Sequence, residues 1–358
     1  MMGERAYDLV IGGAGFIGSN VAARLARARH PVLIFDNLSR PGTERNLSWL
    51  LARHASGIDV LEADVRDAEA VQRAVAQAHT VYHFAAQVAV TTSLQHPRFD
   101  HDVNTGGTLN VLEAMRNCRQ PPRLVFTSTN KVYGALGDLP LRAGSGGYQP
   151  VDGNVRAHGI AESQPLSFTS PYGCSKGAAD QYVLDYARTF GLPAAVLRMS
   201  CIYGPHQFGN EDQGWVAHFM RQAALGEAIT FYGDGLQVRD VLFVEDLADA
   251  LFSAVDRLPQ IAGEAFNIGG GPDHVLSLRS LVERLATLPS GRPTVHMADW
   301  RPSDQRYYVS DTRKFQRATG WRPRVAIDDG LRRLSKWMTR ELEALQPSRD
   351  SRPGRVAL

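Results

Sequence analysis

The 358-residue sequence predicts an α/β fold with a doubly wound parallel sheet and a smaller C-terminal α/β lobe. Two observations predict this fold class. Short apolar runs alternate with amphipathic stretches of ten or more residues through the first 130 residues, which is typical of βαβ units. A glycine-rich turn beginning at Gly12 then joins the first apolar run to the first amphipathic stretch, in the position that a phosphate-binding turn takes.

The expected elements follow in order along the chain. Strands are expected at 7–11, 32–35, 60–61, 81–84, 124–127 and 194–199. Helices are expected at 17–29, 107–117, 172–190 and 216–225, and Gly191 with Pro193 beyond it should end the third. Residues 135–167 lose the periodicity and are rich in Gly, Pro, Ser and Asp, so a functional loop is expected there.

Composition excludes several classes of protein. The 39 basic and 37 acidic residues leave a formal net charge of +2, which does not predict a nucleic-acid partner. Three dispersed cysteines argue against a disulfide framework and favour a reducing cytoplasm. Neither a secretory pattern nor a long apolar span is present, so neither export nor a membrane segment is expected. No metal site is expected.

The turn Gly12-Gly-Ala-Gly15-Phe-Ile-Gly18 has a matching acidic partner. Asp36 follows Gly15 by 21 residues, at the end of the second expected strand, where a carboxylate binds the adenosine ribose of a dinucleotide. Because that carboxylate repels a 2′-phosphate, NAD is expected rather than NADP. The alternative is a glycine turn that only packs. Asp64, after the third strand, is either an adenine contact or an ordinary turn residue.

Tyr172 and Lys176 stand four residues apart at the start of the third expected helix, hence on one face. A nearby ammonium favours the phenolate, so the pair is a candidate acid/base for a sugar hydroxyl. Thr129, at the end of the fifth strand, is the candidate third hydroxyl, with Ser128 as the second choice. Tyr-x-x-x-Lys also occurs by chance, and either hydroxyl could cap a turn instead.

These residues resemble the extended short-chain dehydrogenase/reductase family of NAD-dependent sugar epimerases and dehydratases, which has a Rossmann fold. The resemblance runs from Tyr7 to about Trp337. It implies an NAD-binding domain at 1–199, a mainly nucleotide-sugar-binding lobe at 200–346 and a flexible tail at 347–358. It implies these cofactor-binding residues: Gly12, Gly15, Phe16, Ile17, Gly18, Asp36, Asn37, Asp64, Val65, Phe84, Ala85, Ala86, Tyr172 and Lys176.

Within this family, three stretches look most similar to the CDP-paratose 2-epimerases, also called CDP-tyvelose epimerases. They are residues 128–134, residues 170–181, and Gln207-Phe followed by 212–216. The similarity gives Thr129, Tyr172 and Lys176 the catalytic roles. It implies these substrate-binding residues: Gln87, Asn130, Lys131, Gln207, Gln213, Val216, Arg239, Arg301 and Asp304. Arg239 would hold the diphosphate, although each arginine could instead form an ordinary ion pair.

The pair after Thr129 separates the possible reactions. The 4,6-dehydratases carry Asp-Glu there and the UDP-glucuronate decarboxylases a glutamate, whereas this sequence has Asn130-Lys131. Elimination of water needs those carboxyls, so dehydration is disfavoured. The expected activity is inversion of C2 in a CDP-activated deoxyhexose through a transient ketone. A UDP-sugar 4-epimerase, acting on UDP-glucose or UDP-glucuronate, is the alternative, followed by a dehydratase or a non-catalytic NAD-binding protein.

The expected partners are the sugar nucleotide and a second copy of the chain. Helices at 104–117 and 172–190 resemble those that build the family's dimer, so a homodimer or homotetramer is expected. Their apolar faces could equally belong to the core of one chain.

Overall fold

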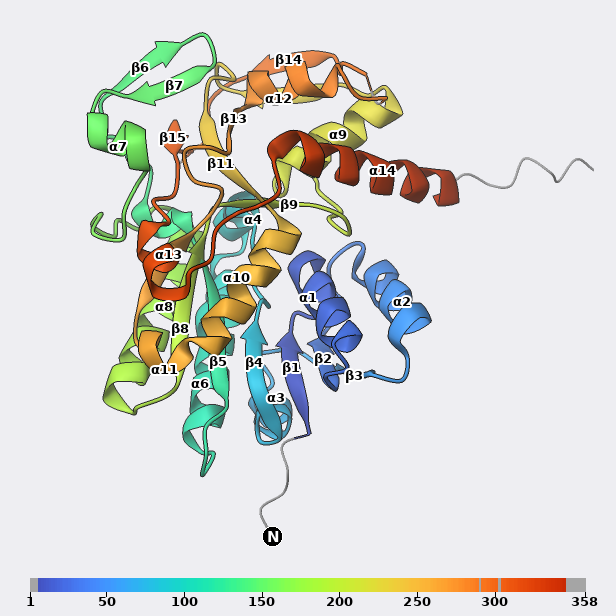
Figure 1. The fold of residues 1–358 in the computed structure, drawn as a ribbon, viewed down its shortest axis with the longest axis vertical. Coiled ribbons are helices and arrows are strands. Elements are labelled where there is room, and N and C mark those ends of the chain that lie inside the picture. Colours follow the sequence, from blue (N-terminus) through green and yellow to red (C-terminus); the bar gives the residue numbers. More distant parts are fainter. Residues whose placement is uncertain (1–5, 290, 302–303, 346–358) are drawn as a thin grey trace, which may run out of the picture.

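The structure is a computed structural model that describes residues 6–289, 291–301 and 304–345. A larger lobe built on a parallel sheet carries a smaller lobe above the carboxyl ends of its strands (Figure 1). The predicted tail at 347–358 lies outside the described residues. Among the helices of the described segments, none is both long and apolar enough to cross a membrane.

The predicted doubly wound sheet is confirmed. Its seven strands run in the order β12-β8-β5-β4-β1-β2-β3, and every neighbouring pair is parallel. The six predicted strands are all present, and β12 is an addition. The strands are β1 (Tyr7–Ile11), β2 (Val32–Asp36), β3 (Ile58–Glu62), β4 (Ala78–His83), β5 (Arg123–Thr129), β8 (Ala194–Met199) and β12 (Ala265–Ile268).

Alternate residues of each strand bury side chains on opposite faces, as Leu9 and Ile11 do on one face and Val10 on the other. Helices cover both faces, and these apolar contacts form the core. One face holds α1 (Phe16–Arg27), α2 (Thr43–His54), α10 (Val244–Asp256), α11 (Leu258–Ile261) and α13 (Arg313–Thr319). The other holds α3 (Ala68–Val75), α6 (Gly107–Arg116) and α8 (Ser170–Thr189). Beside α8 run α4 (Val90–Gln95), α5 (Pro97–His101) and the π-helical turn η1 (Asp102–Gly106).

The smaller lobe combines a mixed sheet, a strand pair and three helices around a separate apolar core. Its sheet contains β9 (Cys201–Tyr203), β11 (Val238–Phe243), β13 (Val275–Ser277) and β15 (Tyr307–Tyr308), and its pair is β10 (Ile229–Tyr232) with β14 (Val295–Ala298). Its helices are α9 (Trp215–Leu225), α12 (Leu278–Leu285) and α14 (Ile327–Leu345). Because α10 and β12 return to the larger lobe, residues beyond 199 contribute to both lobes.

Two local expectations are corrected. The segment 135–167 is not one irregular loop, since it contains the hairpin β6 (Leu141–Gly144) and β7 (Gly147–Pro150) and the helix α7 (Gly153–His158). Strands of four residues joined through Gly144-Ser-Gly-Gly147 are too short to show an alternating pattern. Helix α8 begins at Ser170 rather than Tyr172, because Pro171 fits the first turn of a helix.

A buried ion pair fixes α8 to the sheet. Arg198, in β8, donates to the Asp180 carboxylate through two nitrogens of its guanidinium, with Nε–Oδ2 at 2.9 Å and Nη2–Oδ1 at 2.8 Å. The Asp180 side chain is 0% exposed and that of Arg198 is 6% exposed. Asp180 lies one turn beyond Lys176, so the pair also sets the position of the helix segment that carries Tyr172 and Lys176.

We predict that Asp180→Ala lowers the free energy of unfolding by about 3–5 kcal/mol, because it leaves a buried guanidinium without its counter-charge. Urea denaturation measures the change, and the exposed Asp185→Ala on the same helix serves as the control. Combining Asp180→Leu with Arg198→Met should recover most of the loss, since neither charge remains. A loss below about 1 kcal/mol in Asp180→Ala would contradict this role.

Candidate active site

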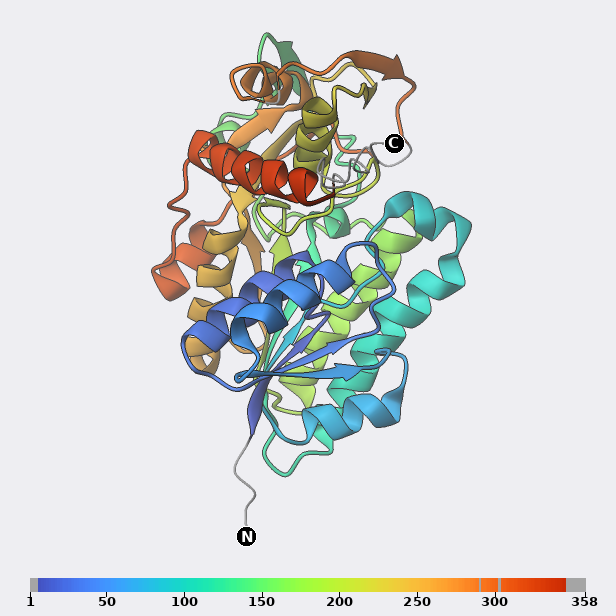
Figure 2. The same ribbon diagram turned by 90° about the vertical axis from the view of Figure 1, so that its right-hand side faces the viewer.

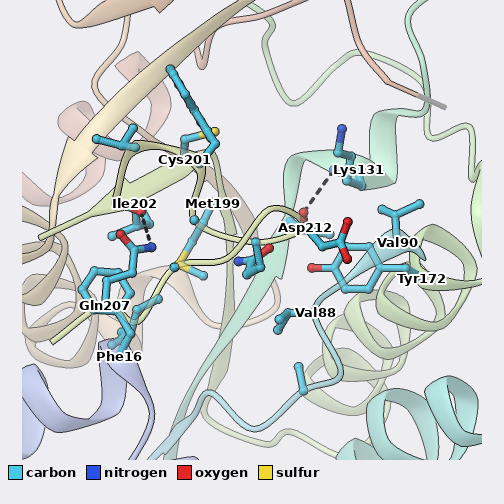
Figure 3. Close-up of a pocket in the computed structure, with 18 of the residues that line it drawn as sticks. Phe16, Val88, Val90, Lys131, Tyr172, Met199, Cys201, Ile202, Gln207 and Asp212 are labelled. Atoms are coloured by element: carbon cyan, nitrogen blue, oxygen red, sulfur yellow. Dashed lines mark hydrogen bonds between the residues drawn. The ribbon is translucent and has the colours of Figure 1, made fainter. Parts of the chain in front are cut away.

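A cavity of about 430 Å³ opens at the carboxyl edge of the parallel sheet, between the two lobes (Figure 3). Strand ends and the glycine turn of the larger lobe line one side, and segments of the smaller lobe line the other. The predicted site residues that line it are Gly12, Gly15, Phe16, Ile17, Gly18, Phe84, Ala86, Thr129, Asn130, Lys131, Tyr172, Lys176, Gln207, Gln213, Val216, Arg239, Arg301 and Asp304.

The glycine turn leaves no room for side chains. Gly12 has φ +80°, and a Cβ there would lie 2.6 Å from the backbone nitrogen of Ala85. A Cβ on Gly18 would collide with the backbone at Gly12. The turn ends at the N-terminus of α1, whose unpaired N–H groups and dipole favour an anion. The residues present therefore fit the diphosphate of a dinucleotide.

Asp36 bonds directly to this turn. Its Oδ2 accepts a hydrogen bond from the Ala14 N–H at 2.9 Å, and its Oδ1 accepts one from the Leu38 N–H at 2.9 Å. Each carboxylate oxygen retains acceptor capacity, which a ribose hydroxyl could use. Asn37 donates to Asp64 at 2.8 Å, so these two predicted residues touch each other.

Five predicted residues lie outside the cavity lining besides Asp36: Asn37, Asp64, Val65, Ala85 and Gln87. Asp64 also binds the Arg66 guanidinium, and this hydrogen bond lowers the pKa of Asp64 to about 2. The side chain of Gln87 is used within the chain, since its Nε2 donates to the Ala89 carbonyl and to Asp100.

The three predicted catalytic side chains meet at the edge of the sheet. Thr129 ends β5, and Tyr172 and Lys176 stand on the first two turns of α8. The Thr129 hydroxyl donates to Asn130 Oδ1 at 3.3 Å, and it lies close enough to the Tyr172 phenol to lower its pKa. The Lys176 ammonium donates to the Thr127 carbonyl at 2.8 Å and lies 4.2 Å from the centroid of the Phe126 ring. Ser128, the second choice, also lines the cavity, and its buried hydroxyl has no partner among the described residues.

Burial governs the protonation of this pair. Desolvation raises the pKa of Tyr172 to about 12, although the hydrogen bond with Thr129 opposes it. Desolvation likewise lowers the pKa of Lys176 to about 7, against the attraction of Asp180 and Asp100. Burial therefore outweighs the Thr129 and Arg40 contributions that lower the Tyr172 pKa, and the role of Lys176 in favouring the phenolate stays a prediction.

Cations gather at the other end of the cavity around one carboxylate. Asp304 Oδ1 lies 2.8 Å from Arg239 Nη2 and 3.8 Å from Lys131 Nζ. Burial, with repulsion from Arg239, lowers the pKa of Lys131 to about 8. Lys131 has the Gln305 side chain as a further partner, at 3.5 Å. Two cations sharing one carboxylate leave this end with positive charge for an anionic ligand.

Arg301 lies farther along the same side. Its guanidinium stacks over the Tyr232 ring, 3.8 Å from the centroid, and pairs with Asp212 at 3.2 Å. Tyr232 in turn donates to Glu211 at 2.7 Å. Arg301 and Arg239 therefore each form an ion pair with a carboxylate in this structure, which is the alternative role that the sequence left open for them.

The loop that follows β9 joins the two sides of the cavity. Asn46, in α2, donates to the Ala14 carbonyl of the glycine turn at 3.1 Å and to the His206 carbonyl of this loop at 3.2 Å. Asn20, in α1, donates to the Pro205 carbonyl at 3.0 Å. The cofactor turn and the loop of the smaller lobe are therefore bonded through the helices of the larger lobe.

Sequence reasoning missed several lining residues. Gln237 could have been found, because it stands two residues before Arg239 and therefore on the same face of an extended segment. Others carry no motif, namely Arg40, Val88, Val90, Thr91, Leu94, Thr230 and Tyr232. Among the described residues, no group of three or more His, Cys, Asp or Glu side chains is arranged to hold a metal ion.

Comparisons with known proteins agree with this geometry. A model of the NAD dependent epimerase/dehydratase family matches residues 9–269. CDP-paratose 2-epimerase from Salmonella typhi is 40% identical over 336 residues, which cover 92% of this chain and 98% of that protein. dTDP-glucose 4,6-dehydratase 1 from Escherichia coli (strain K12) is 32% identical over 347 residues, which cover 92% of this chain and 91% of that protein.

Solved structures agree as well. The crystal structure of the UDP-glucose 4-epimerase of Thermus thermophilus in complex with NAD matches with a TM-score of 0.77 at 32% identity, covering 92% of this chain and 98% of that one. The resemblance drawn from the glycine turn and from Tyr172 and Lys176 is thus confirmed. The chain belongs to the NAD dependent epimerase/dehydratase family.

Proposed function

We propose that this protein is an NAD-dependent nucleotide-sugar epimerase that inverts C2 of a CDP-activated deoxyhexose of the paratose/tyvelose type. One observation carries the proposal: Thr129, Tyr172 and Lys176 share a cavity with the glycine turn, while Asn130 and Lys131 occupy the places of the dehydratase carboxyls. The 40% identity to the Salmonella typhi enzyme supports the choice of sugar and nucleotide. The three thiol cysteines and a nucleotide-sugar substrate favour a cytoplasmic enzyme.

In this proposal Tyr172 is the acid/base. Once Tyr172 has lost its own proton, against the burial that favours its neutral form, its phenolate oxygen takes the proton of the C2 hydroxyl, and the Thr129 hydroxyl beside it orients the sugar oxygen. NAD, when bound, supplies the acceptor for the hydride that leaves C2 and returns it later. Lys176 holds a positive charge beneath the site from its place on the Thr127 carbonyl. After the ketone presents its other face, Tyr172 gives the proton back to the inverted hydroxyl.

The charged end of the cavity suits the rest of a sugar nucleotide. Arg239 offers a planar guanidinium to the diphosphate, and Lys131 adds a second cation beside it. Neither Asn130 nor Lys131 can act as the pair of carboxyl acid/base groups that expels water from C5 and C6. The alternative UDP-sugar 4-epimerase uses the same three catalytic groups and differs only in how the sugar is held.

We predict that the NAD-loaded protein converts CDP-paratose to its C2 epimer, which NMR of the products detects. Tyr172→Phe should lower turnover by about 10²–10⁴-fold, because the proton then has no acceptor. The variant should still contain NAD, measured by its absorbance after denaturation. If fully loaded protein yields no C2-inverted product and instead inverts C4 of UDP-glucose, the alternative holds.

We predict that affinity for CDP-glucose falls as the pH rises from 7 to 9. Lys131, with a pKa near 8, is an ammonium below that pH and neutral above it, so attraction for the diphosphate is lost. Titration calorimetry should show Kd rising by about tenfold. Lys131→Arg keeps its charge over this range and should flatten the dependence, while Lys131→Gln should bind weakly at both pH values. If Kd depends on pH as steeply in Lys131→Arg as in the starting protein, a group other than Lys131 causes the pH dependence.

We also propose that two copies pair through the face formed by α5, α6 and α8, the teal to yellow-green helices of Figure 2. Large apolar side chains are exposed there, including Phe99 at 42%, Tyr182 at 42% and Phe190 at 46%. Light scattering should give the mass of a dimer or tetramer, and Tyr182→Arg with Phe190→Glu should give a monomer. Met297→Glu, at a more exposed apolar site on the smaller lobe, is the control. A monomeric wild-type protein would refute the pairing.

A further inference from the structure

The cavity is apolar where it surrounds the catalytic tyrosine. Val88 and Val90 flank Tyr172 in the close-up (Figure 3), and Leu94 lines the cavity from the same segment. Met199, the last residue of β8, and Ile202, in β9, also line it. The valines and Leu94, called here the valine wall, carry no hydrogen-bonding side-chain group.

The valine wall is held in a fixed position relative to Tyr172. Ser93, fully buried, donates from Oγ to the Val90 carbonyl at 2.7 Å and accepts the Tyr172 N–H at 3.1 Å. The first bond lies within α4, and the second joins the first turn of α4 to the first turn of α8. The apolar surface is therefore positioned before any sugar arrives.

Polar groups lie on the other sides of the tyrosine. Thr129 interacts with its phenol, and Asn130 and Lys131 follow directly in the chain and also line the cavity. In the wall segment, only Thr91 offers a hydroxyl to the cavity, and its buried Oγ1 has no partner among the described residues. A sugar carbon whose oxygen reaches Tyr172 and Thr129 would place a neighbouring ring carbon beside the valine wall, because the wall lines the cavity next to Tyr172 (Figure 3).

A hydroxyl directed at Val88, Val90 or Leu94 would lose its water partners and find no replacement on those side chains, since Thr91 is the one lining residue of this segment with a hydroxyl. A methylene there would instead bury apolar surface. We propose that Val88 and Val90 are specificity-determining residues that select sugars lacking a hydroxyl on C3, beside the reacting carbon. This inference rests on the proposed function, which identifies C2 as the reacting carbon and therefore C3 as its neighbour. It adds the residues that distinguish a C3 methylene from a C3 hydroxyl.

The test compares sugars that share one nucleotide and differ at C3 only. Titration calorimetry on the NAD-loaded Tyr172→Phe protein, which cannot turn them over, measures CDP-glucose against CDP-3-deoxyglucose. We expect the deoxy sugar to bind about 10- to 100-fold more tightly, the range within which an apolar pocket rejects an added hydroxyl. UDP-glucose and UDP-3-deoxyglucose are compared in the same way, which separates recognition of the sugar from recognition of the nucleotide base.

Isosteric variants then test whether Val88 and Val90 cause the preference for the deoxy sugar. Val88→Thr and Val90→Thr, made singly and together, supply a hydroxyl without changing shape and should reduce the preference at least tenfold. Val88→Ala, which opens space for the sugar hydroxyl, is the second variant should a threonine disturb folding. Val60→Thr, on β3 at the edge of the sheet, is the matched control and should leave the preference unchanged.

The outcomes are distinct. Equal binding of the two sugars by the starting protein, or a preference that survives all three wall variants, would overturn the inference. Because binding is measured without turnover, the preference for the deoxy sugar can be read whether or not the protein catalyses C2 inversion. Conversely, a preserved preference in a protein that forms no C2-inverted product would refute the proposed function alone.

Discussion

The bidentate pair between Asp180 and Arg198 is the interaction on which the arrangement of the site depends. Arg198 also donates to the Tyr133 hydroxyl at 3.1 Å, and that hydroxyl donates to Asn267 at 2.7 Å. The Asn267 backbone N–H in turn donates to Glu162 at 2.7 Å. One buried network thus ties α8, β8, β12 and the turn η2 (Asn130–Tyr133), which follows Thr129. The elements that carry the acid/base groups cannot shift independently, because each would leave a buried polar group unpaired.

Burial of this kind has a direct effect on chemistry. The low-polarity surroundings that hold Tyr172 neutral and weaken the charge of Lys176 also strengthen any interaction with a charge that enters. The cavity is divided accordingly, with cations around Asp304 at one end and apolar side chains beside Tyr172 at the other. A sugar nucleotide has the same division, since its charge is concentrated in the diphosphate and the deoxygenated part of its sugar is apolar.

The larger lobe was predictable because its signals are local. The glycine turn, the acid at Asp36 and the alternation of strand and helix all follow from short-range sequence rules. Strand β12 was not predictable, since Asn267 interrupts a four-residue run, and its place in the sheet depends on pairing with distant β8. The direction in which individual side chains point could not be predicted from the sequence either. Gln87 binds its own chain and Val88 lines the cavity instead, because contacts with Asp100 and Ala89 decide that direction.

The bonds from Asn20 and Asn46 to the Pro205 and His206 carbonyls have a kinetic consequence. Both donors stand in helices of the larger lobe, and Asn46 also holds the glycine turn. The ring centroids of His206 and Trp49 lie 3.7 Å apart beside these hydrogen bonds. Separating the loop from the larger lobe would therefore break several contacts at once. If these contacts must break before a dinucleotide can leave the turn, they would slow the exchange of the cofactor with solvent. An enzyme that returns its hydride to the same sugar loses nothing by such a long residence time, and its redox carrier behaves as a built-in part of the protein.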